Sequence, residues 1–125
     1  MMLKEIRDYL ATAITSDSFS YGYMPDEPIS VVTLYEYAGK PPEFTHDGKK
    51  LGHPGLQVIA RGSDYKLVRE RLEAIEAILN AVVNQSIGGT VYQRIFALQS
   101  AFPVPGWEKG HVRLAQNYGI ERTEG

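Results

Sequence analysis

The chain contains no cysteine, which excludes disulfide bonds, thiol catalysis and cysteine-ligated zinc. It also lacks a run of lysine or arginine, and its fifteen acidic and thirteen basic side chains give a net charge of −2. Tight, salt-sensitive binding to nucleic acid phosphates is therefore not indicated. Charged residues interrupt the N-terminal segment, so neither a signal-peptide core nor a membrane span is predicted. We expect one intracellular domain over residues 1–125 with no membrane partner, unless it is exported within a larger particle.

The side chains that usually carry catalysis are scattered along the sequence. His46 and His53 share one connection with Asp47, which allows a metal site, but solvated loop residues explain them better. His111 lies far away at the start of a strand. Ser63 is explained as a helix cap rather than as a nucleophile. We therefore predict no enzyme activity, no metal and no cofactor.

The stretch from Gly55 to Asn84 organises the predicted fold. Residues 56–61 are rich in β-formers and lie between two glycines, which predicts a strand. Ser63 follows as the N-cap of a helix, and the charge of Asp64 favours the helix dipole. The next apolar residues recur at spacings of three and four, which indicates one helix face; they are Tyr65, Val68, Leu72, Ile75, Leu79 and Val82.

The flanking segments supply the remaining predicted elements. Apolar spacing predicts a helix from Met2 to Thr15 and, by alternation, strands over residues 29–37, 90–100 and 111–121, with a possible short strand near 19–23. The last four residues are expected to fray. The order α-β-β-α-β-β predicts an α+β fold, a mainly antiparallel sheet of about four strands with two helices packed on one face.

The connection from Ala38 to Pro54 is rich in proline and glycine, so we predict a long loop that projects from the body. Phe44 in this loop is a candidate for a contact with another chain. Tyr21 and Tyr23 are further candidates, because tyrosine is enriched in interfaces. Packing against the sheet is an equally good explanation of both tyrosines.

A second connection, from Ala101 to Gly110, is unusually apolar and carries Phe102, Val104 and Trp107. An apolar loop on a small domain either folds back over its own core or meets another chain. Its prolines stiffen it, so less conformational entropy is lost when it docks. We predict that Trp107 anchors a contact with another chain, either a neighbouring subunit or a different partner of the assembly; folding back over its own sheet is the alternative.

Three segments, taken in order, resemble one family of small virion proteins of tailed bacteriophages, the minor capsid or tail-terminator-like proteins. They are residues 22–37, with GYMPDEP leading into VVTLYEY; residues 53–62, HPGLQVIARG, followed by the helix; and residues 88–100, GGTVYQRIFALQS, with the closing strand RLAQNY. The resemblance covers nearly the whole chain, and the collinear pattern carries it rather than any catalytic motif. The chain departs from the family at residues 104–107, where VPGW replaces a more polar turn.

The resemblance implies a structural tail terminator or tail-completion protein of the virion. Such proteins look like compact α+β domains that form a homo-oligomeric ring, commonly hexameric, at the head-proximal end of the tail. The implied partners are the tail tube protein and a head-completion or connector protein, while genomic DNA only passes through the lumen. Two alternatives remain: another head–tail joining or minor capsid protein, or a small cytosolic ligand-binding domain or enzyme that uses the Ala38–Pro54 loop as a lid.

Overall fold

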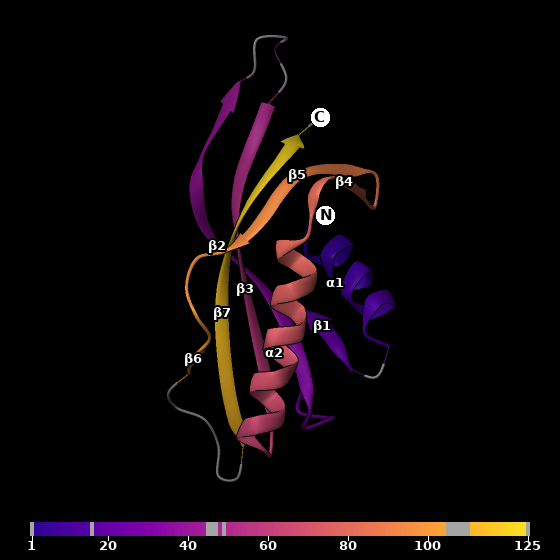
Figure 1. Ribbon diagram of the computed structural model, residues 1–125, viewed down its shortest axis with the longest axis vertical. Helices are drawn as coiled ribbons and strands as arrows, with labels where there is room; N and C mark the ends of the chain where they lie inside the picture. Colours follow the sequence, from indigo (N-terminus) through magenta and orange to yellow (C-terminus); the bar gives the residue numbers. More distant parts are fainter. Residues whose placement is uncertain (1, 16, 45–47, 49, 105–110, 125) are drawn as a thin grey trace.

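The computed structural model describes residues 2–15, 17–44, 48, 50–104 and 111–124, and the structural statements below concern these residues (Figure 1). The elements, in chain order, are α1 (Met2–Ala13), β1 (Phe19–Tyr21), β2 (Val31–Phe44), β3 (Lys50–Gly62), α2 (Tyr65–Asn80), β4 (Val83–Ile87), β5 (Thr90–Ala97), β6 (Phe102–Pro103) and β7 (Val112–Glu124). Both predicted helices are present, as α1 and α2. The short strand that was possible near residues 19–23 is β1.

The strands form one curled, mixed sheet, so the predicted sheet of about four mainly antiparallel strands below two helices was wrong. The sheet has seven strands in the order β1-β2-β3-β7-β5-β4, with β6 pairing to β7 beside this path. β1 runs parallel to β2, and the other pairs are antiparallel. The two ends of the order, β1 and β4, both contact α1. The sheet therefore bends around α1 and α2 instead of offering them one flat face (Figure 1).

α2 lies along β3, β7 and β5 and is held by its apolar stripe (Figure 1). Val68, Leu72, Ile75 and Leu79 are 1% exposed or less, as the spacing of three and four predicts. The helix cap is Asp64 rather than Ser63, because the carboxylate Oδ1 of Asp64 accepts a hydrogen bond from the backbone N–H of Lys66 at 2.9 Å. The helix is also shorter than predicted, because the chain turns into β4 at Val83.

One hydrophobic core joins the sheet to both helices. Its strand residues alternate with residues of the opposite face, as the period of two requires; they are Val32, Leu34, Leu56, Val58, Ala60, Ile87, Tyr92, Ile95, Leu114, Tyr118 and Ile120. α1 contributes Met2, Leu3, Ile6 and Leu10. Full burial of one leucine or isoleucine contributes about 1.5–3 kcal/mol relative to exposure, so this core supplies most of the stability.

Residues 38–54, predicted as a loop, are largely strand. β2 and β3 stay paired beyond the core, with Lys40 opposite His53, Glu43 opposite Leu51 and Phe44 opposite Lys50. We call residues 37–44 of β2 and 50–55 of β3 the arm; it projects past the helices at the top of Figure 1. The end of β7, predicted to fray, pairs with the arm through Thr123 and Glu124. β2 contains two register shifts, and the second, between Lys40 and Glu43, spans Pro41 and Pro42, which led to the prediction of a loop.

The opposite end of the sheet is organised by one buried arginine. Arg61, 5% exposed, donates hydrogen bonds from Nε and Nη2 to four backbone carbonyls of the segment before β2. The acceptors are Pro25, Asp26, Pro28 and Ile29, at 2.6–3.2 Å. A proline-rich segment that cannot pair as a strand thus satisfies its carbonyls with one guanidinium group. None of the helices among the described residues is both long enough and apolar enough to span a membrane.

Candidate functional site

The ionisable side chains do not assemble into a catalytic or metal-binding constellation within the described part of the chain. No three His, Asp or Glu side chains there are placed to hold a metal ion. His53 lines a groove beside the arm, whereas His111 lines a cleft at the other end of the sheet. His46 and Asp47 lie outside the described residues, so a site that combines them with His53 stays untested.

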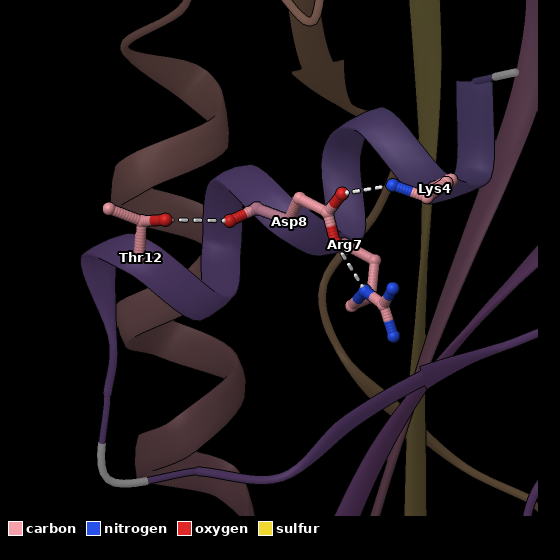
Figure 2. Close-up of polar contacts among 4 residues, drawn as sticks. All are labelled: Lys4, Arg7, Asp8 and Thr12. Carbon is pink, nitrogen blue, oxygen red and sulfur yellow. Dashed lines mark hydrogen bonds and ion pairs between the residues drawn. The ribbon is translucent and has the colours of Figure 1, made fainter.

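The polar residues on the outer side of α1 form a local network (Figure 2). Asp8 accepts hydrogen bonds from Lys4 Nζ at 2.8 Å and from Arg7 Nε at 2.7 Å, and Thr12 Oγ1 donates to the Asp8 carbonyl at 3.0 Å. The bonds from Lys4 and Arg7 lower the pKa of the Asp8 carboxyl, and the pKa of Lys4 is raised in return. Lys4 and Arg7 share the single carboxylate of Asp8, and such exposed pairs along a helix contribute little more than local support to α1.

A cleft of about 680 Å³, which we call the lower cleft, lies next to the segment that Arg61 holds. Tyr23 lies at this cleft and is 71% exposed, the second most exposed of the large apolar side chains described. Tyr35 lines the same cleft, and burial raises the pKa of its hydroxyl although Arg113 acts in the opposite direction. The cleft therefore combines the exposed ring of Tyr23, on the segment before β2, with tyrosine and arginine side chains of the strands β2, β3 and β7.

A row of two aromatic residues and two glycines crosses the sheet at the base of the arm. Tyr37 pairs with Gly55, Gly55 with Gly119, and Gly119 with Phe96, so the row spans β2, β3, β7 and β5. A Cβ atom at Gly55 would lie 2.7 Å from the Tyr37 ring, and one at Gly119 would lie 2.5 Å from Phe96. The rings thus lie flat over the glycines, which have no side chain of their own to pack. Tyr37 Oη also donates to the Tyr118 carbonyl at 3.1 Å, which ties β2 to β7.

A groove of about 520 Å³ adjoins this row on the face that points away from the helices. Apolar residues make up much of its lining, among them Tyr37, Leu51, Pro54, Phe96 and Leu98. Leu98 is 52% exposed there. At its edge, Arg94 donates from Nε to Glu121 Oε1 at 2.7 Å and lies 4.2 Å from the centre of the Phe96 ring. We call this hollow the outer groove; it joins an apolar floor to a charged rim, as sites for protein contacts do.

The structure places the predicted contact residues in different surroundings. Phe44, near the end of the arm, is 74% exposed. Phe102 and Val104 are partly buried, and Phe102 pairs with Ala115 of β7. Tyr21 packs against the edge of the core, with the Arg7 guanidinium 5.0 Å from its ring centre. Tyr23 is the exposed residue of the lower cleft, and Trp107 lies outside the described residues.

The outer groove was not predicted from the sequence, because its residues come from four strands that are distant in the chain. A signal was present in Tyr37 and in the aromatic and glycine residues of β5 and β7, but only their cross-strand pairing reveals the row. The arm was missed because prolines and glycines in residues 38–54 indicated a loop.

Comparison with known proteins identifies the class of protein to which this fold and surface belong. The sequence profile of a family described as bacteriophage tail terminator protein matches residues 5–110. A chain from the virion of a native gene transfer agent (GTA) particle has a similar fold, with a TM-score of 0.59 and 12% identity over 97% of this chain and 90% of that one. A second solved chain has a TM-score of 0.58 and 10% identity, over 99% of this chain and 91% of that one. No protein among the curated sequences gives a significant match.

The chain belongs to the bacteriophage tail terminator family, because the family profile matches most of its length. Its role is that of a structural tail-terminator protein of the virion. The predicted resemblance is confirmed, and the two solved chains support the fold rather than any particular partner.

Proposed function

We propose that this protein forms a hexameric ring at the head-proximal end of the phage tail, where it stops growth of the tail tube and joins the tail to the head. It acts as a structural part, without catalysis and without a cofactor. Its partners are further copies of itself, the tail tube protein and a head-completion or connector protein. The match to the tail terminator family over residues 5–110 is the observation that supports this proposal.

Two properties of the chain fit such a role. Its net charge of −2 allows DNA to pass through a lumen without binding strongly to the wall. The arm holds strand geometry far from the core while leaving Phe44 exposed, and a side chain of this size gains by burial against another chain. The ring would assemble in the host cytoplasm before the tail meets the head.

The contact surfaces of the ring follow from the exposed aromatic residues. We assign contacts to Phe44 on the arm and to Tyr23 at the lower cleft, since both remain largely in solvent in one chain. The segment with Phe102, Val104 and Trp107 supplies a third contact, and Tyr21 contributes through the edge of β1. The arm and the start of β2 lie at opposite ends of the molecule, which suits a subunit that meets neighbours on more than one side (Figure 1).

The decisive experiment measures tube length. Purified tail tube protein is allowed to polymerise with and without this protein, and lengths are read by negative-stain electron microscopy. We expect that substoichiometric protein shortens the tubes and that a ring of extra density appears at one tube end. The same preparation is incubated with connector-bearing heads in parallel.

The outcomes separate the proposal from its rivals. Binding to heads with no effect on tubes would indicate a head–tail joining or minor capsid protein instead. Binding to neither, together with a raised melting temperature in a ligand or metal screen, would indicate a small ligand-binding domain or enzyme, because a ligand of the native state must stabilise it.

A further inference from the structure

Two arginine side chains lie side by side at the end of the sheet opposite the arm. Arg61 of β3 and Arg113 of β7 are direct partners in the antiparallel register, and both line the lower cleft. The Cβ atoms of such a pair lie about 5 Å apart on one face of a sheet. Their neighbours Ala60 and Leu114 belong to the core, so the two arginines lie on the opposite face. Like charges placed in this way repel each other, and the pair favours an anion beside it.

The described part of the chain gives this pair no bonded counter-charge. Arg61 donates from Nε and Nη2 to backbone carbonyls, which are neutral. Arg113 Nε is buried and has no hydrogen-bond partner among the described residues. The arginines that do form ion pairs there are Arg7, Arg69, Arg71 and Arg94. Because a buried donor without a partner is unfavourable, an acceptor that enters the cleft is stabilised by Arg113.

The lower cleft has room for such an acceptor and offers a further donor. Its volume of about 680 Å³ is far larger than one acidic group. Burial raises the pKa of the Tyr35 hydroxyl, while the charges of Arg113 and Arg61 act against that rise. The hydroxyl therefore lies within electrostatic reach of both guanidinium groups. An anion bound to the arginines has this O–H group nearby as an additional donor.

We propose that the lower cleft is a binding site for a carboxylate group, held by Arg113 with Arg61 beside it. The planar guanidinium group of Arg113 binds two oxygens of one carboxylate through parallel hydrogen bonds, one of them from Nε. Arg61 is 5% exposed and is held by four carbonyls, so its charge is fixed before the ligand arrives. Little conformational entropy is then lost on binding. The site lies within a single chain and does not depend on the proposed ring.

The acidic residues of the cleft favour a carboxylate over a phosphate. Asp26 and Glu27 line the cleft together with the two arginines, so the cleft has no excess of positive charge. Directed hydrogen bonds rather than net charge must therefore hold the ligand. The same two carboxylates repel a phosphate dianion about twice as strongly as a monovalent carboxylate.

Nuclear magnetic resonance observes the proposed contact directly. The Nε–H group of Arg113 gives a signal that is identified by its loss in the variant Arg113→Gln. Sodium acetate, exchanged for sodium chloride at constant ionic strength, should shift this signal along a saturating curve. Acetamide has a similar shape without the charge and should leave the signal in place. An Arg113 signal that does not move in acetate would overturn the proposal, and a stronger response to inorganic phosphate would overturn its assignment to a carboxylate.

Arg113→Gln and Arg69→Gln form a matched pair of variants. Arg69 lies on α2, where its ion pair is with Glu73, and its replacement changes the net charge by the same amount. The acetate affinity is measured from the backbone amide signals of residues that line the cleft. It should fall at least about tenfold in Arg113→Gln, through loss of charge-assisted hydrogen bonds, and should be unchanged in Arg69→Gln. Equal affinities of the two variants would show that acetate binds elsewhere.

Thermal melts test the absence of a partner for Arg113 without any ligand. In chloride buffer, Arg113→Gln should melt no earlier than the wild type, because it removes one of two like charges. Acetate should then raise the melting temperature of the wild type more than that of Arg113→Gln, since a ligand of the native state stabilises it. A variant that melts several degrees earlier in chloride would show that Arg113 already has a stabilising partner in its own chain, and would contradict the proposal.

Discussion

β3 has two halves that differ in what covers them. In its second half, Leu56, Val58 and Ala60 are fully buried beneath the helices. In its first half, the same strand belongs to the arm, where neither α1 nor α2 lies over it and Lys50 is exposed (Figure 1). Pairing with β2 and β7 nevertheless continues along both halves. Strand geometry therefore persists where the core has ended, and the covered half supplies stability while the uncovered half offers a surface.

The strongest way to break this contrast is to remove a buried side chain from α2, the helix that packs on β3. Leu72 on α2 is 0% exposed, and Leu72→Ala should lower the free energy of unfolding by about 2–5 kcal/mol, through lost burial and the cavity left behind. Denaturant unfolding measures the change. Leu67→Ala on the exposed side of the same helix is the control and should change stability by less than about 0.5 kcal/mol. A small loss at Leu72 would mean that α2 does not pack on the sheet as described.

An intermediate effect is expected where the two halves meet. A Cβ atom at Gly119 would lie 2.5 Å from the Phe96 ring, so Gly119→Ala must displace that ring and should cost about 1–3 kcal/mol. Removing the ring relieves the clash, so the double variant with Phe96→Ala should lose less than the sum of the single losses. Thermal or denaturant unfolding of all three proteins measures this coupling. Strict additivity would show that the ring does not lie over the glycine.

A smaller effect should appear at high pH. Burial raises the pKa of Tyr118, with the nearby Glu76 carboxylate adding to the shift, and burial with a hydrogen bond to Glu5 raises that of Tyr92. The unfolded chain ionises these tyrosines from about pH 10, whereas the folded chain keeps them neutral. Their contribution is thus fully present below pH 10 and is lost as the pH rises above it.

Melting temperatures between pH 8 and pH 11 measure this loss. Tyr118→Phe removes one titrating hydroxyl and its hydrogen bond to Gln116 Oε1 at 3.1 Å, so it should lower the free energy of unfolding by about 1 kcal/mol at neutral pH. It should also reduce the fall in melting temperature between pH 8 and pH 11. Tyr23→Phe, at the exposed cleft, should leave the decline unchanged. Identical pH profiles for Tyr118→Phe and the wild type would show that Tyr118 ionises normally in the folded protein.

The smallest effect on the folded monomer is expected on the arm. Phe44→Ser removes a ring that is 74% exposed, so it should change the free energy of unfolding of the dilute protein by less than about 0.5 kcal/mol, as a surface substitution does. Its consequence should appear in assembly instead, as a shift to slower-sedimenting species. A large loss of monomer stability would show that the arm is part of the core and would remove the contrast between the two halves.

Local patterns in the sequence were sufficient for the helices but not for the sheet. The stripe from Val68 to Leu79 predicted the buried face of α2, because each contact in a helix is made within a few residues. The assignment of the cap to Ser63 rather than Asp64 was wrong by one residue, since either side chain suits that position. The curl of the sheet depends on pairing between β3 and β7, which are far apart in the chain, and no local period encodes it.

The surface was predictable only in part. Phe44 and Tyr23 were identified as contact candidates from residue type alone, and both are largely exposed; whether they make contacts stays a prediction. The outer groove could not be derived, since Tyr37, Phe96 and Leu98 become neighbours only when β2 and β5 join the same sheet. Arg61 gave no signal either, because four carbonyl acceptors on one loop have no signature in side-chain composition.

The two prolines of the arm have one more consequence. β1 pairs only with residues 32–34 of β2, so the outer edge of β2 beyond them is unpaired among the described strands. Pro41 and Pro42 lie on that stretch and have no N–H to offer an incoming strand. The two prolines remove N–H donors that an added strand would need, so they hinder the addition of a further strand along this edge.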